Sequence, residues 1–207
     1  MLRTLMILLS VGLIATMSPA GIVDGPHNMA AEGYDITNDE VCLPCHTPHG
    51  SSEDEYLWNQ TIPADTAITV RDGAVLGHVS LMCMGCHDGV TAISASESGM
   101  TVAADAALGT DLSKDHPVGV DYGSSYRRAP AEPIRGGRMQ GVKVVVGQNP
   151  DGTDITKDLP LYHRDDNGTG LEQVECATCH TPHTDAQDLL RVDNAGSTLC
   201  TGCHTAQ

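Results

Sequence analysis

The sequence has 207 residues and a formal net charge of −16, from 11 basic and 27 acidic side chains. So acidic a chain is a poor partner for nucleic acid or for an anionic membrane surface. It contains no Phe, one Trp and five Tyr, which excludes a polypeptide core of ordinary size. We therefore expect a mostly irregular fold with short helices and few strands.

The N-terminal segment, residues 1–20, predicts a secretory signal peptide. It carries Arg3, an apolar run from Leu5 to Ala15, and the small-residue ending Ser18-Pro19-Ala20. The apolar run is too short to span a bilayer comfortably. We therefore expect cleavage after Ala20 and export of residues 21–207, with no membrane span in the mature chain.

The pattern Cys-x-x-Cys-His, which first begins at residue 42, is the attachment signal for a c-type haem. Two cysteines three residues apart project from one face of a helical turn, where each can form a thioether to a porphyrin vinyl group. The histidine that follows is then held under the iron as its proximal ligand. The pattern occurs four times and uses all eight cysteines: Cys42, Cys45 and His46; Cys83, Cys86 and His87; Cys176, Cys179 and His180; Cys200, Cys203 and His204.

Zinc ribbons and disulfides also use paired cysteines. The last two pairs have a spacing compatible with a zinc ribbon, and cysteines in an oxidising compartment can form disulfides. Neither alternative requires a histidine directly after each second cysteine. The sequence therefore predicts four covalently bound haem c groups, with the chain wrapped around them.

The segments between the motifs offer few regular elements. Gly21 to Asp39 has the composition of an exposed arm, and Trp58 is expected to pack on a haem edge. A helix is expected near Val102 to Leu108, and a strand at the mostly β-branched stretch from Val142 to Val146. Turn signals lie at 149–152 and 165–168. A calcium loop at 165–170 is an alternative, although its spacing does not match a helix-loop-helix cation site.

Six histidines remain after the four proximal ones: His27, His49, His78, His116, His163 and His183. Four irons need four distal ligands, so every iron can be bis-histidine. His49 and His183 lie three residues after a proximal histidine and cannot reach the far face of the same iron. Each is therefore expected to ligate a neighbouring haem. We expect His27 and His116 to be the other two distal ligands, and His78 and His163 to be surplus.

An internal repeat suggests how the haems are grouped. Cys42 to His49 and Cys176 to His183 share the sequence Cys-x-x-Cys-His-Thr-Pro-His. Each is followed by a Cys-x-x-Cys-His motif that lacks the Thr-Pro-His extension. This predicts two haem-pair halves, at about residues 40–90 and 174–207, within a single tetrahaem domain over 21–207. Separate domains are not expected, because so few apolar side chains cannot give each half its own core.

These motifs, together with Leu57-Trp58-Asn59, His116 to Gly119 and Leu190 to Asn194, resemble the outer-surface tetrahaem c-type cytochromes of metal-reducing bacteria. In particular, they resemble the members that polymerise into extracellular filaments, or nanowires. The resemblance covers nearly the whole mature chain, and its specific part is the cysteine and histidine motifs. It implies four bis-histidine haems in a stacked chain, and a histidine at a subunit boundary that ligates a haem of the next subunit. His27 is our candidate for that histidine.

The expected function is electron transfer along these haems without substrate turnover, from subunit to subunit within a filament. The acidic surface suits other cytochromes or extracellular metal oxides as redox partners, and the expected location is extracellular or at the cell surface. A monomeric periplasmic shuttle is one alternative. A multihaem nitrite or hydroxylamine reductase is another, which needs a five-coordinate iron and nearby cations. The chain has one small basic cluster, which we expect to pair with haem propionates: Arg127, Arg128, Arg135 and Arg138.

Overall fold

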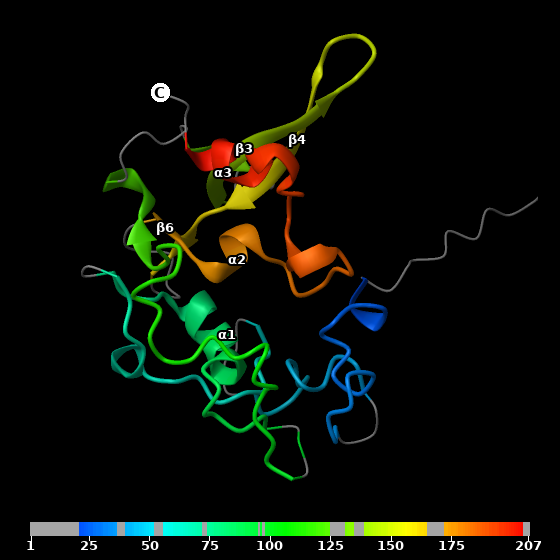
Figure 1. Ribbon diagram of the computed structural model, residues 1–207, viewed down its shortest axis with the longest axis vertical. Helices are drawn as coiled ribbons and strands as arrows, with labels where there is room; N and C mark the ends of the chain where they lie inside the picture. Colours follow the sequence, from blue (N-terminus) through cyan, green and yellow to red (C-terminus); the bar gives the residue numbers. More distant parts are fainter. Residues whose placement is uncertain are drawn as a thin grey trace, which may run out of the picture.

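The structure is a computed structural model that describes residues 21–36, 40–51, 56–71, 74–94, 96, 98–124, 131–134, 139–164 and 172–204. Within these residues the regular elements are short and are joined by long stretches of coil (Figure 1). The α-helices are α1 (His78–His87), α2 (Cys176–Cys179) and α3 (Thr198–Cys203). The strands are β1 (Val120–Asp121), β2 (Glu132–Ile134), β3 (Met139–Gln148), β4 (Asp154–Pro160), β5 (Tyr162–His163) and β6 (Glu172–Val174). Single 3-10 turns are η1 (Gly21–Val23), η3 (Asp65–Ala67), η4 (Tyr122–Ser124), η6 (Gln187–Leu189) and η7 (Ala195–Ser197).

Several sequence expectations lie outside the described residues. These are the signal peptide at 1–20, the turn and calcium-loop candidates at 165–170, and the basic cluster at Arg127, Arg128, Arg135 and Arg138. Among the helices of the described residues, none is both long enough and apolar enough to cross a bilayer.

The strands form two antiparallel sheets, with the orders β1-β6-β5 and β2-β3-β4. β3 and β4 form a hairpin that projects from one end of the molecule (Figure 1). Its turn is closed by Asn149, which donates its N–H to the Thr153 carbonyl at 2.8 Å, and by Gly152, which donates to the Asn149 carbonyl at 2.9 Å. The expected strand at 142–146 and the expected turn at 149–152 are therefore both confirmed.

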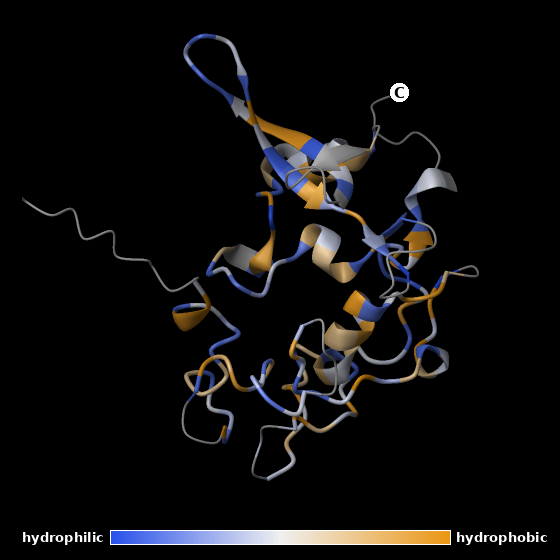
Figure 2. Cartoon of the chain, turned by 180° about the vertical axis from the view of Figure 1, so that it is seen from behind, coloured by the Kyte–Doolittle hydropathy of each residue, from blue (hydrophilic) through white to orange (hydrophobic). Residues whose placement is uncertain are grey.

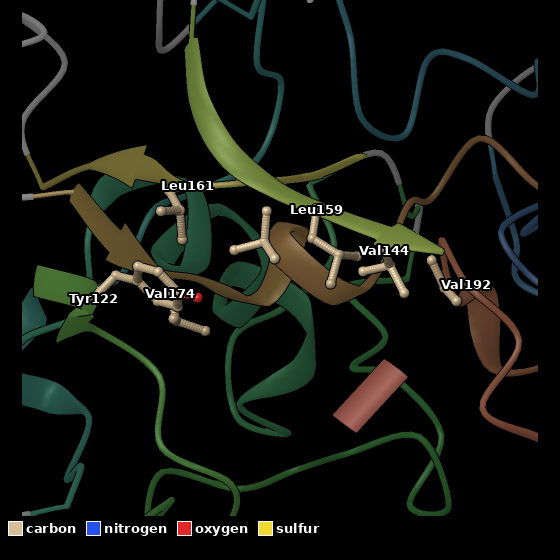
Figure 3. Packing of buried hydrophobic residues seen from close by; sticks show 7 residues of the cluster. Tyr122, Val144, Leu159, Leu161, Val174 and Val192 are labelled. Atoms are coloured by element: carbon tan, nitrogen blue, oxygen red, sulfur yellow. The ribbon is translucent and has the colours of Figure 1, made fainter. Parts of the chain in front are cut away.

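The base of this hairpin carries the largest apolar cluster. Val142 and Val144 are buried while Lys143 and Val145 are exposed, as the alternation of a strand requires. The alternation ends at a bulge between Val145 and Gly147. The buried face packs with residues from neighbouring segments, which Figure 3 labels: Tyr122, Leu159, Leu161, Val174 and Val192.

The other apolar clusters of the described residues are smaller. One contains Ile68, Leu76, Met84 and Leu112, and the other contains Met29, Ile36 and Ile93. Figure 2 shows the apolar residues in several separate places along the chain instead of in one continuous layer. The polypeptide therefore builds small local cores around α1 and around the hairpin base.

Two glycines let the motif helices approach their neighbours. A Cβ at Gly85 of α1 would lie 2.4 Å from the Thr61 carbonyl oxygen, and a Cβ at Gly202 of α3 would lie 2.4 Å from Cγ2 of Val144. The corresponding residues of the other two motifs, Pro44 and Thr178, are fully buried. In the first three motifs the residue before the second cysteine therefore faces the polypeptide interior, and in α3 the glycine at this position lies against β3.

Two sequence expectations were wrong. Residues 102–108 contain a single turn at 104–106 instead of a helix, in which Ala106 and Ala107 donate their N–H groups to the Ala103 carbonyl at 2.9 and 3.0 Å. The segment then leaves this turn, because Leu108 donates its N–H to the His87 carbonyl at 2.8 Å. The segment from Gly21 is also not an exposed arm. Met29 is buried with Ile36 and Ile93, and Gly25 lies against the Thr184 carbonyl, where a Cβ would approach to 2.7 Å. In both places long-range contacts override the local sequence signal.

We predict that Leu159→Ala destabilises the protein by about 2–5 kcal/mol, because Leu159 is fully buried in the hairpin-base cluster. Ile155→Ala on the same strand is the control. Ile155 is 44% exposed, so its truncation should cost less than about 1 kcal/mol. Chemical unfolding of the purified holoprotein, followed by circular dichroism, measures both values. Equal losses for the two variants would contradict the assignment of the core.

Candidate haem-ligating site

Each Cys-x-x-Cys-His motif forms one helical turn. The first cysteine's carbonyl accepts the histidine's backbone N–H at 2.8 Å in the first motif, 3.0 Å in the third and 2.8 Å in the fourth, and the second motif is the C-terminal part of α1. Cysteines three residues apart lie on one face of such a turn. All eight cysteines are free thiols, so each is available for a thioether bond.

The first and third motifs repeat the same local structure. Thr47 donates its N–H to the Leu57 carbonyl and Asn59 donates to the Cys45 carbonyl, at 2.8 and 2.9 Å. In the third motif the equivalent bonds run from Thr181 to Leu189 and from Arg191 to Cys179, both at 2.8 Å. Leu57 and Leu189 also share a positive φ, of 52° and 54°. The repeat seen in the sequence is thus a repeat of structure that extends beyond the matching letters.

The rings of three proximal histidines are oriented by the backbone. Nδ1 of His46 lies 2.7 Å from the Tyr56 carbonyl oxygen, that of His87 lies 2.8 Å from the Ala106 oxygen, and that of His180 lies 2.9 Å from the Asp188 oxygen. A carbonyl can only accept a hydrogen bond, so Nδ1 carries the proton in each ring. Nε2 is then left with its lone pair, which is the form that a metal binds.

Three proximal rings also lie opposite a second histidine. The ring centroids are 6.0 Å apart for His46 and His183, 6.1 Å for His87 and His27, and 6.2 Å for His204 and His116. Two imidazoles bound to opposite faces of one iron have centroids about 6 Å apart, since each metal–nitrogen bond is about 2 Å and each nitrogen lies about 1.1 Å from its ring centre.

Ordinary aromatic packing also gives centroid distances in this range, so the distance alone does not identify a haem site. The identity of the two histidines in each pair is stronger evidence for a haem site than the distance between them. Each pair joins one motif histidine to one histidine outside the motifs. The residues present therefore fit a haem with two axial histidines.

The environment keeps two of these rings neutral. Burial lowers the pKa of His27, and the neighbouring His87 lowers it further. Burial likewise lowers the pKa of His183, with His46 as the second cause. Neutral imidazole is the form that offers a lone pair to a metal at pH 7.

The remaining histidines behave differently. His49 is exposed, and no histidine ring of the described chain lies opposite His180. His163 in β5 is exposed, and His78 opens α1 with its ring stacked on Tyr56 at 6.4 Å. Of the four distal ligands expected from the sequence, the structure thus places His27, His116 and His183 opposite a proximal ring, but not His49. His27, our candidate for ligation across a subunit boundary, lies against His87 of its own chain.

The cysteine sulfurs of successive motifs lie near one another. Burial raises the pKa of Cys86 to about 12, and nearby Cys45 of the first motif adds to the rise. The neighbouring Cys176 thiol of the third motif raises the pKa of Cys83 in the second motif, while Cys83 lowers the pKa of Cys176. Burial raises the pKa of Cys179 to about 11, with Cys203 of the fourth motif as the next cause. The attachment points therefore follow one another in chain order through the molecule.

The sequence did not reveal the partners that support these rings. The acceptors at Tyr56, Ala106 and Asp188 are backbone carbonyls, so their side chains carry no signal. Trp58, expected at a haem edge, lies with its ring centroid 6.0 Å from that of His46, and its bridge to His46 places it beside the first motif.

Comparison with known proteins agrees with this site. Residues 170–207, which contain the third and fourth motifs, match the family described as a doubled CXXCH motif. A search of curated proteins finds no match. The motifs indicate covalently bound c-type haem, and their doubling supports a multihaem c-type cytochrome whose role is electron transfer.

Proposed function

We propose that the protein is a tetrahaem electron carrier in which two histidines ligate each iron. The observation that carries the proposal is the set of three histidine pairs with ring centroids 6.0–6.2 Å apart. A bound haem supplies an iron that cycles between ferric and ferrous states. The chain's own residues hold that iron: cysteines anchor the porphyrin edge, a carbonyl orients the proximal ring, and a second histidine closes the far face.

This ligation favours a carrier over an enzyme. With both axial positions filled by histidine, no position remains for a substrate, and axial ligands together with burial set the potential. The order of the sulfur neighbours, from the first motif to the fourth, supports a continuous path of closely stacked haems through the chain.

The reductase alternative rests on one specific observation. His180 has no histidine ring opposite it within the described chain, so its haem is the candidate for a five-coordinate iron. A high-spin ferric signal in the wild-type protein, together with reduction of nitrite or hydroxylamine, would favour that function.

The extracellular filament is part of the proposal. His49 is exposed and is the one proposed distal ligand without a proximal ring opposite it. We propose it as the fourth distal ligand, for the haem held by His180, supplied by the same chain or by the neighbouring subunit of a filament. The net charge of −16 suits basic faces of other cytochromes or metal oxides as electron acceptors. A monomeric periplasmic shuttle remains the alternative assembly state.

We predict that His183→Ala converts one haem from low-spin to high-spin, because His46 loses the ring opposite it. Electron paramagnetic resonance and the visible spectrum of the ferric protein measure this change, and added imidazole should reverse it. His163→Ala is the control, since His163 is an exposed residue of β5, and its spectrum should equal that of the wild type. An unchanged spectrum for His183→Ala would sink the assignment.

We also predict that His49→Ala leaves the haem of His180 high-spin, and the assembly state then shows where His49 acts. If it ligates across a subunit boundary, electron microscopy should show filaments for the wild type and dispersed particles for the variant. If it acts within its own chain, the two proteins should have the same particle size by sedimentation. If the wild-type protein stays monomeric at high concentration, the monomeric periplasmic shuttle is favoured over the filament.

A further inference from the structure

A buried carboxylate links the helices of the second and third motifs. Glu175 is 1% exposed and lies between the start of α1 and the start of α2, which pack against each other near the centre of the molecule (Figure 1). Its Oε1 accepts the backbone N–H of Gly77 at 3.0 Å, and its Oε2 accepts the hydroxyl of Ser80. Both donors belong to the first turn of α1 or its cap.

The link is closed by a second set of hydrogen bonds. The Ser80 hydroxyl oxygen accepts the backbone N–H of Cys176 at 2.9 Å. Glu175 also caps α2, since its backbone N–H donates to the Thr178 hydroxyl at 3.0 Å. One carboxylate and one hydroxyl therefore join two helices whose sequences lie 95 residues apart.

The joined helices are the ones that carry haem attachment points. Cys83 and Cys86 are on α1, and Cys176 and Cys179 are on α2. Cys176 follows Glu175 directly in the sequence, and Cys83 lies three residues after Ser80 on α1. Because each sulfur holds an edge of its porphyrin, the position of α1 against α2 sets the position of one haem against the other.

A carboxylate is a costly way to join two helices, which makes a purely structural role a poor explanation. Burial raises the pKa of Glu175 to about 7, and no lysine or arginine of the described residues forms an ion pair with it. Apolar side chains would pack such a contact without that penalty. The charge and the two acceptor oxygens therefore point to a role that an apolar contact cannot supply.

We propose that Glu175, together with Ser80, is a positioning residue for electron transfer between the haem of the second motif and the haem of the third. The proposal rests on the proposed function for the haems themselves. One electron passes from the ferrous iron of one haem to the ferric iron of the other, with no bond made or broken. An external low-potential reductant supplies that electron. Glu175 holds the two attachment helices in register and, when ionised, brings a negative charge close to both haems.

Three variants of the holoprotein separate the hydrogen bonds from the charge. Glu175→Ala removes both. Glu175→Gln removes the charge but keeps an oxygen that accepts from Gly77 and adds an amide that donates to the Ser80 oxygen. Glu172→Gln is the matched control, because Glu172 lies on β6 three residues earlier and undergoes the same change in charge. The haem-pair readout is the Soret couplet in circular dichroism, which reports coupling between neighbouring haems.

We expect Glu175→Ala to lose most of the couplet and to exchange the amide hydrogens of Gly77 and Cys176 at least tenfold faster. Glu175→Gln should keep the couplet and shift the potentials of the two haems upward, because a nearby negative charge stabilises the more positive ferric state and its removal favours the ferrous state. Glu172→Gln should show neither change. All variants should keep low-spin haem. If the wild-type protein itself shows no low-spin haem, the proposed function is refuted independently of the role of Glu175.

The proposal is overturned if Glu175→Ala keeps the Soret couplet and the amide exchange rates of the wild-type protein. If Glu175→Ala does not accumulate as holoprotein, Ser80→Ala replaces it, since that change removes the link between Glu175 and Cys176. A weaker couplet in Ser80→Ala supports the positioning role. An unchanged couplet there, together with an unchanged potential in Glu175→Gln, overturns it.

Discussion

The ring of a motif histidine presents the lone pair of Nε2 to an iron when Nδ1 carries the proton, and a backbone carbonyl accepts a hydrogen bond from that proton in His46, His87 and His180. The carbonyls come from turns and from the short 3-10 turn η6, 8 to 19 residues away in sequence. A helix or an inner strand uses its carbonyls in its own hydrogen bonds, so it has none to spare for a ring. The need for free carbonyls at fixed positions gives a physical reason for so much irregular chain around the motifs.

The histidine pairs also tie the two halves of the chain together. His46 of the first motif lies opposite His183, which follows the third motif. The hydrogen bonds of Glu175 and Ser80 join the helix of the second motif to the helix of the third. The repeat in sequence therefore does not produce two independent units. Each half supplies histidines and contacts that the other half lacks, which agrees with the small size of the separate apolar clusters.

Local signals in the sequence were sufficient for the parts of the structure that depend on neighbouring residues. The β-branched run in β3 and the Asn-Pro-Asp-Gly turn after it are of this kind. The failures at 102–108 and at the N-terminal segment share a different cause. At each place a distant group, the His87 carbonyl or the Thr184 backbone, determines the conformation. The pairing of each proximal ring with its partner, and the role of Glu175, depend on the same kind of long-range contact, so no local pattern could indicate them.

The exposed apolar side chains near the proximal histidines indicate what completes the core. Leu57 is 45% exposed beside the bridge between His46 and Trp58, and Leu108 is 56% exposed although its N–H is bound to the His87 carbonyl. A flat apolar group held between each histidine pair would cover such side chains and gain the free energy of burying them. The porphyrins would then supply the flat apolar surface that a sequence without Phe does not provide. Since a group that binds the folded chain stabilises it, we expect haem attachment to stabilise this fold.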